Sequence, residues 1–220
     1  MIGVQRAWCP ACLVPSVIGA GLLWVGWFGF NAGSALAADG LATSAFVATH
    51  IATAAAALSW LAMDWVLRDK PTVLGAASGA VAGLVAITPG SGFVGPMSAL
   101  WIGIGGGVLC SIACSLKPKL GYDDSLDVVG VHGVGGTWGA LATGLFASKA
   151  INAAGNDGLF FGNPGQLWIQ FVSVVVTLLL AIVGTYVILS IIKVIMGLRI
   201  GDEEERMGLD LSQHNERAYE

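Results

Sequence analysis

The segment VVGVHGVGGTWGALATGLFAS, residues 128–148, runs for 21 residues without an Asp, Glu, Lys or Arg. An α-helix needs about 20 such residues to cross a bilayer. His132 is the one titratable side chain within the segment. Because an ionisable residue inside a membrane is energetically costly, His132 is a candidate functional residue. The alternative is a histidine that only hydrogen-bonds to a neighbouring helix, but the flanking glycines, which allow other backbones to come close, favour a functional role.

The composition of the whole chain agrees with a membrane protein. Of the 220 residues, 55% are hydrophobic and only 11% are charged, and the mean hydropathy is +0.78. An average soluble domain has about 25% charged residues. We therefore predict an all-α, multi-pass protein in contact with the lipid bilayer. Seven of the 14 acidic residues fall in residues 202–220, so the net charge of −4 indicates no partner, and no basic patch indicates nucleic-acid binding.

Six apolar segments predict a polytopic helical bundle of about six transmembrane helices. They cover approximately residues 15–37, 41–66, 72–88, 93–116, 126–148 and 166–196. The same boundaries predict three parts of the chain, namely an atypical N-terminal segment at 1–14, a transmembrane domain at 15–196 and a charged tail at 197–220.

Small residues recur at helical spacing in three of these segments. They are Ala54 to Ala57, then Gly75, Gly79 and Gly83, and finally Gly103 and Gly107. A small residue at every fourth position lets two membrane helices approach closely. Together with the total of 32 glycines, this spacing predicts a compact bundle.

The basic residues predict the orientation. With the N-terminus inside and six spans, nine Lys and Arg residues fall on the inner side and only Lys149 falls outside. Lys and Arg are enriched in cytoplasmic loops. We therefore expect a protein of the cell membrane with both termini in the cytoplasm.

Enzyme and metal motifs are weak. Cys9 and Cys12 have the spacing of a redox or metal pair, but no second pair completes a zinc site. Cys110 and Cys114 lie in an apolar run and are expected to be packing residues. The sequence contains no phosphate-binding loop, serine elbow or zinc-protease motif. A membrane enzyme using His132 with nearby carboxylates lacks a nucleophile motif, so we expect no enzyme, no cofactor and no metal.

The first segment contains a candidate cation site in its predicted outer half. Trp27 and Ser34 are seven residues apart and Phe30 is three beyond Trp27, so all three would share one face of a continuous helix. An aromatic face beside a hydroxyl can hold a small cation. An aromatic belt at the membrane surface explains the same residues without a ligand. Periodicity does not decide between the two.

Asp127 stands at the predicted cytoplasmic start of the segment that contains His132. A carboxylate stabilises a helix N-terminus, so a structural role as a cap and a functional role are both open for Asp127. His132 follows five residues later, roughly 7 to 8 Å along the helix axis. A neutral imidazole offers one donor and one acceptor. It can therefore guide a small polar molecule or pass a proton.

Several stretches resemble the ammonium transporter family (Amt/MEP/Rh). They are GWFGFNAGS at 26–34, GAASGAVAGLV at 75–85, TP at 88–89, DVVGVHGVGG at 127–136 and the tail GLDLSQHNERAY at 208–219. The resemblance runs in order from about residue 16 to the end. It covers the second half of the family, which corresponds to the last six of eleven spans.

This resemblance implies transport of ammonium or ammonia, with methylammonium as an analogue, through a pore in each subunit of a homotrimer. It implies that Trp27 and Ser34 match an outer ammonium-recruitment site and that Phe30 matches one of two gating phenylalanines. His132 would match the second of two pore histidines, and Asp127 an acidic residue at the start of the same span. The tail would bind a cytosolic regulator, or be a solvated charged end.

Ammonium uptake with deprotonation before conduction is the leading hypothesis, because a cation that keeps its charge pays a large desolvation cost in an apolar pore. The family spans with the other pore histidine and the other gate phenylalanine have no counterpart here, and His50 and His214 do not substitute by position. A half-transporter acting with a partner and a non-transporting assembly or regulatory subunit are the alternatives.

Overall fold

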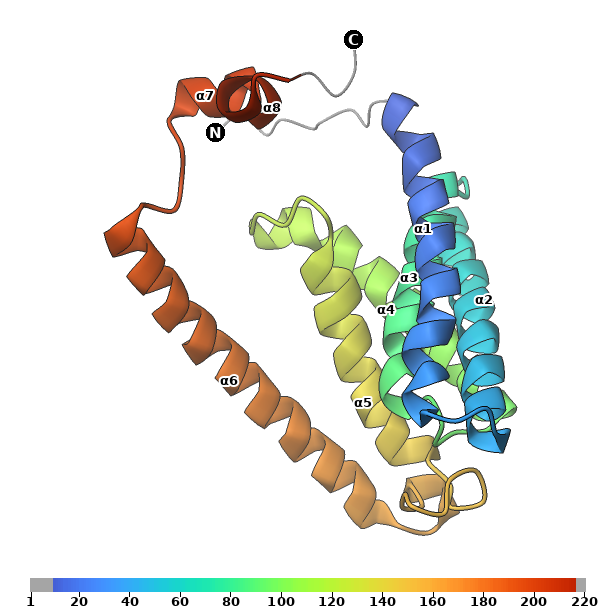
Figure 1. Cartoon of the computed structure of the whole chain (residues 1–220). Helices are drawn as coiled ribbons and strands as arrows, with labels where there is room; N and C mark the ends of the chain where they lie inside the picture. The colour runs from blue at the N-terminus through green and yellow to red at the C-terminus, as the bar shows by residue number, and fades with distance from the viewer. Residues whose placement is uncertain (1–9, 217–220) are drawn as a thin grey trace. The chain divides into compact units, whose positions relative to one another are not determined.

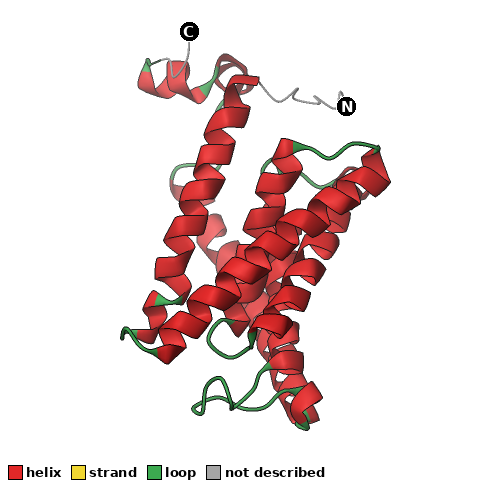
Figure 2. Cartoon of the chain, turned by 90° about the vertical axis from the view of Figure 1, so that its right-hand side faces the viewer, coloured by secondary structure: helices red, strands yellow, loops and turns green. Residues whose placement is uncertain are grey.

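The computed structural model describes residues 10–216, with side chains from residue 13 onward. Every regular element in this part of the chain is helical, as Figure 2 shows, which confirms the predicted all-α class. The long helices are α1 (Pro10–Asn31), α2 (Gly40–Arg68), α3 (Val73–Ile87), α4 (Pro96–Leu120), α5 (Val134–Phe146) and α6 (Pro164–Ile195). The short elements are the 3₁₀ turns Gly33–Ala35, Thr88–Gly90 and Leu159–Phe161, the π-helix Val129–Gly133, and helices α7 (Asp202–Met207) and α8 (Leu209–His214).

Five described helices are long and apolar enough to cross a membrane. These spans are Leu13–Ala35, Gly40–Arg68, Val73–Gly90, Pro96–Leu120 and Pro164–Ile195. The remaining predicted segment, 126–148, is also helical but is divided into the five-residue π-helix and the 13-residue α5. Its continuous α-helix is therefore shorter than the sequence predicts, because the turns around His132 are wound more widely.

The chain divides after Val174 into two compact units. The first unit contains α1 to α5 and the beginning of α6, and the second contains the rest of α6 with α7 and α8. Within the first unit, α1 to α5 run in alternating directions, as Figure 1 shows. The C-terminal ends of α2 and α4 therefore lie at the same end of the bundle as the N-terminal ends of α3 and the π-helix.

Helix α2 is in backbone contact with α3. A methyl group added at Gly83 would lie 2.7 Å from the carbonyl oxygen of Ala52, and one at Gly79 would lie 2.9 Å from the carbonyl oxygen of Ala56. Neither distance leaves room for a side-chain atom. The close packing predicted from the glycine spacing of α3 is confirmed, and its partner is the alanine-rich middle of α2.

Helix α4 approaches the same two alanines from another direction. A methyl group at Gly103 would overlap the backbone of Ala52, and one at Gly107 would overlap the backbone of Ala56. The two alanines are themselves fully buried. Each therefore receives a glycine from α3 and a glycine from α4, which makes α2 the centre of the first unit.

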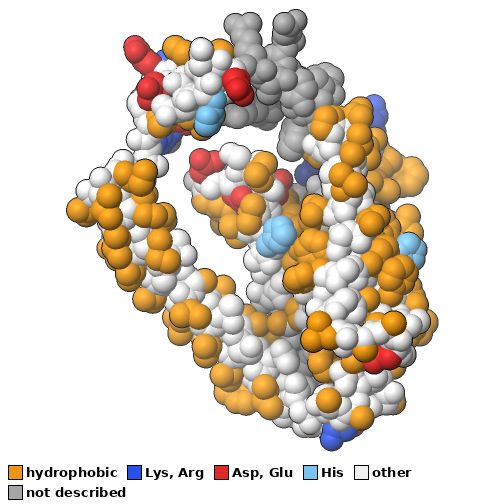
Figure 3. All heavy atoms as spheres, viewed as in Figure 1, with side chains coloured by type: hydrophobic (Ala, Val, Ile, Leu, Met, Phe, Trp, Pro, Cys, Tyr) orange, Lys and Arg blue, Asp and Glu red, His pale blue; other side chains and the backbone are white. Residues whose placement is uncertain are grey.

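The outward surfaces of the helices are apolar, as the orange side chains in Figure 3 show. Large exposed side chains on α1 and α2 include Leu22, Val25, Leu58 and Val66. In water such a surface would be unusual for a monomer, but lipid is an apolar solvent. The exposed surface and the buried small residues together describe a membrane protein.

Substituting Gly83 by Ala tests the backbone contact between α2 and α3. The added methyl group has no space, so we expect Gly83→Ala to lower the free energy of unfolding by about 1–3 kcal/mol. The matched control is Gly21→Ala in α1, where nothing lies within 4 Å of the new methyl group. Denaturant titration of the purified chain in detergent measures both, and equal stabilities would contradict the packing described here.

Candidate functional site

His132 lies on the π-helix that precedes α5. The residues just before it face α4: Val131 is buried, and a methyl group on Gly130 would lie 2.5 Å from the sulfur of Cys114. His132 itself is exposed. Short π-helical turns are rare in proteins. Those that occur inside helices often lie at functional sites. The π-helix thus buries one side against α4 and presents His132 on another.

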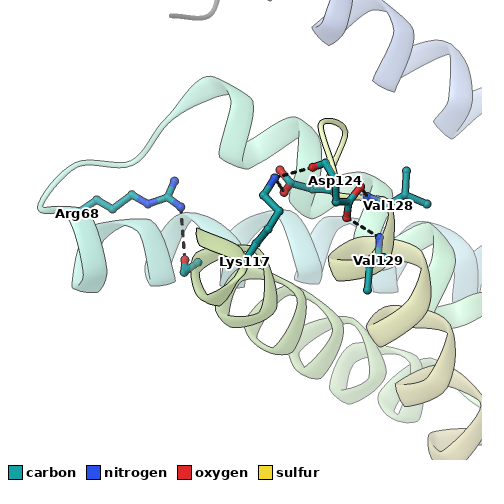
Figure 4. A network of polar contacts seen from close by, with 7 residues as sticks. Arg68, Lys117, Asp124, Val128 and Val129 are labelled. Carbon is teal, nitrogen blue, oxygen red and sulfur yellow. Dashed lines mark hydrogen bonds and ion pairs between the residues drawn. The ribbon is translucent and has the colours of Figure 1, made fainter. Parts of the chain in front are cut away.

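Asp124 caps the N-terminus of this π-helix. Its two carboxylate oxygens accept hydrogen bonds from the backbone N–H groups of Val128, at 2.9 Å, and Val129, at 2.8 Å, which Figure 4 shows. These N–H groups have no partner inside the helix. Sequence reasoning assigned the cap to Asp127 and missed Asp124. The available signal was the run of three acidic residues, Asp123, Asp124 and Asp127, ahead of the apolar segment.

Asp127 has a different structural role at the helix start. Its φ of 57° is left-handed, which turns the chain into the helix, and its carbonyl oxygen accepts the first bond, from Val131 at 2.8 Å. Its carboxylate forms an ion pair with Lys117 of α4 rather than capping the free N–H groups. The expected cap at Asp127 is therefore wrong, while its place at the helix start is as predicted.

Lys117 joins α4 to this turn twice. Besides the ion pair with Asp127, its ammonium group donates a hydrogen bond of 2.7 Å to the carbonyl oxygen of Asp124. The side chains of Lys117 and Asp127 are 22% and 36% exposed, so water screens the pair less than a fully exposed one. We call Lys117, Asp124 and Asp127 the helix-start clamp.

A second polar cluster lies at the same end of the first unit. Asp64 is buried on α2, accepts a hydrogen bond of 2.7 Å from the hydroxyl of Thr72, and forms a 3.5 Å ion pair with Arg68. Thr72 in turn caps α3 through Gly75. Arg68 also donates to Ser115 of α4 at 3.4 Å, as Figure 4 shows. Asp64 thus holds the ends of α2 and α3 together with its charge paired.

Trp27, Phe30 and Ser34 are neighbours near the C-terminal end of α1. The rings of Trp27 and Phe30 meet edge to face with centroids 5.6 Å apart, and the Ser34 hydroxyl donates to the carbonyl oxygen of Phe30 at 2.5 Å. Helix α1 ends at Asn31, so Ser34 lies on the following 3₁₀ turn. The expectation that all three share a face of one continuous helix is therefore wrong for Ser34.

The three side chains differ in how freely they can meet a ligand. Trp27 is half-buried against the apolar core, and its indole nitrogen donates a 2.8 Å hydrogen bond to the hydroxyl of Thr88. Phe30 is 60% exposed, and Ser34 is also exposed. Trp27 is therefore held against the core, whereas Phe30 and Ser34 are accessible to a ligand.

Sequence reasoning missed a row of hydrogen-bonded polar side chains that begins at the end of α1. The side-chain amide of Asn31 donates to the hydroxyl of Thr49 at 3.0 Å, and Thr49 lies 3.4 Å from the hydroxyl of Ser91. Asn31 is 8% exposed. A single Asn near the end of an apolar segment was the signal for it, because buried amides in membrane helices hydrogen-bond across to other helices.

The cysteines show no site in the described chain. Cys9 and the side chain of Cys12 lie outside the described residues, so the prediction for that pair stays untested. Cys110 and Cys114 are free thiols on α4, and both pack against glycines of the π-helix and α5. Within the described part of the chain no three His, Cys, Asp or Glu side chains gather where they could hold a metal ion.

Comparison with known proteins gives consistent matches over nearly the whole chain. The sequence model of the Ammonium Transporter Family matches residues 6–219, which begins earlier than the expected residue 16. The ammonium transporter of Bacillus subtilis is 50% identical over 212 residues, covering 96% of this chain and 52% of that protein. Ammonium transporter Amt1 of Archaeoglobus fulgidus is 44% identical over 210 residues, covering 96% of this chain and 53% of Amt1.

Solved structures match in the same way. The crystal structure of Saccharomyces cerevisiae Mep2 superimposes with a TM-score of 0.82 and 35% sequence identity, covering 87% of this chain and 45% of that one. A sensor Amt protein superimposes with a TM-score of 0.79 and 34% identity. This chain therefore spans about half the length of the relatives it matches.

The contact between Trp27 and Thr88 can be tested by a double-mutant cycle. Trp27→Phe and Thr88→Val each remove one partner of the same hydrogen bond, so the double variant should lose less stability than the two single losses added together. We expect a coupling of about 0.5–1.5 kcal/mol from unfolding titrations in detergent. Thr88→Ser, which keeps the hydroxyl, is the control, and strictly additive losses would show that the bond contributes nothing.

Proposed function

Because this chain belongs to the ammonium transporter family, we propose that it takes part in moving ammonium or ammonia across a membrane. The observation that carries the proposal is the family match over residues 6–219, supported by 50% identity to a bacterial ammonium transporter. Such relatives are transporters rather than enzymes. The apolar spans provide the membrane setting that transport needs.

Recruitment of the cation is assigned to the end of α1. A phenylalanine ring attracts a cation at its face, and Phe30 is exposed there. The hydroxyl group of Ser34 donates its hydrogen bond to the carbonyl oxygen of Phe30. The lone pairs of the Ser34 oxygen therefore remain available to accept a hydrogen bond from ammonium. Trp27, fixed by Thr88, supports the edge of the Phe30 ring. In this proposal Phe30 also gates entry to the pore.

Deprotonation explains selectivity in the proposed mechanism. An ion that enters an apolar path loses its hydration at a cost of many kcal/mol. Ammonium can release a proton and continue as neutral ammonia, whereas K⁺ keeps its charge. His132, exposed on a π-helix whose neighbours are valines and glycines, supplies the polar atoms along such a path. A neutral imidazole can both donate to and accept from ammonia.

We also propose an orientation and an assembly. Arg68 and Lys117 lie at one end of the first unit, and by alternation of the helices Lys149 belongs to the other. The positive-inside rule then assigns the clamp end, and both termini, to the cytoplasm of a cell-membrane protein. Assembly as a homotrimer and binding of a cytosolic regulator by α7 and α8 complete the proposal.

A second candidate is a half-transporter that acts with a partner chain. The chain spans about half the length of its relatives, and in this proposal a partner supplies the equivalent of the other half. The exposed apolar faces of α1 to α5 would then be covered by protein on one side. A non-transporting subunit predicts the same exposed faces but no uptake under any condition.

Methylammonium uptake tests the function directly. Cells without their own ammonium transporters would express the chain alone or together with the N-terminal half of the Bacillus subtilis relative. We expect His132→Ala to change the uptake rate or the selectivity over K⁺ by at least tenfold, because it removes the only polar side chain between Val128 and Gly136. His50→Ala is the matched control, since His50 is an exposed histidine on α2 whose ring lies tilted against that of Trp24.

The outcomes separate the candidates. Uptake by the chain alone supports a six-span transporter, and uptake only with the added half supports the half-transporter. No uptake in either case, with the protein present in the membrane, would contradict both and favour a non-transporting subunit. Uptake that His132→Ala leaves unaltered would remove His132 from the mechanism.

The hydroxyl of Ser34 gives a separate prediction. Loss of a hydrogen bond to a charged group costs about 1.5–3 kcal/mol, so Ser34→Ala should raise the KM for methylammonium roughly tenfold or more. The maximal rate should change little, because recruitment precedes conduction. Ser34→Thr retains the hydroxyl and should keep a near-normal KM. An unchanged KM in Ser34→Ala would exclude Ser34 from recruitment.

A further inference from the structure

The ring of His132 is not held in place by its own hydrogen bonds. Within the described structure the imidazole makes none, and the side chain is exposed. Its direction therefore depends on the backbone that carries it. That backbone is a π-helix in which the N–H of Val134 donates to the carbonyl oxygen of Val129, five residues earlier. Such turns are rare, so the surrounding contacts must stabilise this one.

Two sets of contacts to α4 hold the π-helix. The set of close packing contacts lies beneath Gly130 and Val131, where Cys114 leaves no room for a side chain and the thiol of Cys110 donates a 3.7 Å hydrogen bond to the carbonyl oxygen of Val131. This set fixes the distance between the two helices. It does not fix how the first turn begins, because neither contact involves the N–H groups of Val128 and Val129 at the start of the helix.

The polar set is directional. The two carboxylate oxygens of Asp124 bind the N–H groups of two consecutive residues, Val128 and Val129, and so orient both peptide planes at the helix start. Lys117 then ties the carbonyl oxygen of Asp124 and the carboxylate of Asp127 to α4. The carbonyl groups of Asp127 and Val128, which share these two peptide planes, are thereby fixed five and four residues before His132.

We propose that Asp124 and Lys117 are positioning residues that set the direction of the His132 side chain through the helix-start clamp. Its importance for transport rests on the function proposed above, while the positioning itself does not. Conversion of the π-helix to an α-helix would rotate the residues on one side of it by about 100° relative to the other, because an α-helix has 3.6 residues per turn. The clamp opposes that conversion.

Histidine NMR tests the positioning without requiring transport. The chain contains three histidines, so ¹⁵N-histidine labelling of the purified 220-residue protein in detergent gives one pair of ring-nitrogen signals for each of His50, His132 and His214. We expect Asp124→Ala to shift the His132 signal and to leave the His50 signal unchanged. Asp123→Ala removes an equal charge from the adjacent residue and should shift neither.

Further variants guard against misfolding. Asp124→Asn keeps one acceptor oxygen and should shift the His132 signal less than Asp124→Ala does. Lys117→Met should reproduce the shift, and Lys117→Arg should restore the wild-type position. If Asp124→Ala does not fold, the signals of Asp124→Asn, Lys117→Met and Lys117→Arg decide whether the clamp positions His132. An unchanged His132 signal in these variants overturns the proposal, and so does a common shift of His50 and His132, which would indicate a general structural role.

Uptake measurements give the second readout. In cells where the wild-type chain supports methylammonium uptake, alone or with the added half, Asp124→Ala should lower the maximal rate by roughly ten- to hundredfold with little change in KM. A change in KM alone would contradict positioning of a group that acts after recruitment. Absence of wild-type uptake would contradict the proposed function, and the NMR result would still decide whether the clamp positions His132.

Discussion

Direct backbone contact at the middle of α2 is the constraint on which the rest of the first unit depends. Ala52 and Ala56 each receive one glycine from α3 and one from α4, so the three helices approach as closely as their backbones allow. Lipid gives no hydrophobic driving force for helix association, and close packing with backbone contact takes its place. Larger side chains are consequently directed outward, where they meet an apolar solvent.

Polar groups then determine the axial position and the first turn of each helix, which the glycine contacts do not. Glycine contacts bring helices together but do not determine how far each helix slides or where its first turn begins. At one end of the bundle, Asp64 and the helix-start clamp determine these features through paired charges and capped N–H groups. Near the end of α1, Asn31 and Trp27 do so through hydroxyl groups of Thr49 and Thr88. Apart from the ion pair between Asp64 and Arg68, which lies within α2, each of these bonds joins residues from different helices or from a helix and a loop.

The sequence was sufficient for the class, for five of the six predicted spans and for the packing of α3 and α4 on α2, because apolar length and glycine spacing are local properties. It was insufficient for the ends of helices. The break after Asn31, which moves Ser34 onto a 3₁₀ turn, and the π-helix around His132 both depend on contacts with other helices. The cap illustrates the limit: Asp124 and Asp127 are equally plausible from composition, and only the left-handed φ of Asp127 and the position of Lys117 distinguish them.

The division of the fifth span also has a consequence for biosynthesis. The π-helix and α5 pack Gly130, Gly135 and Gly139 against α3 and α4, and until those helices are in place these glycines offer no apolar side chain to lipid. A nascent segment partitions into the bilayer according to the hydrophobicity of its side chains. The α-helix of this segment has 13 residues, whereas α4 has 25, so during translation the segment would enter the membrane less readily than α4 does, and its stable insertion would follow the arrival of α4, which its glycines contact. Because α4 precedes the π-helix and α5 in the chain, it is synthesised first and is available when they emerge.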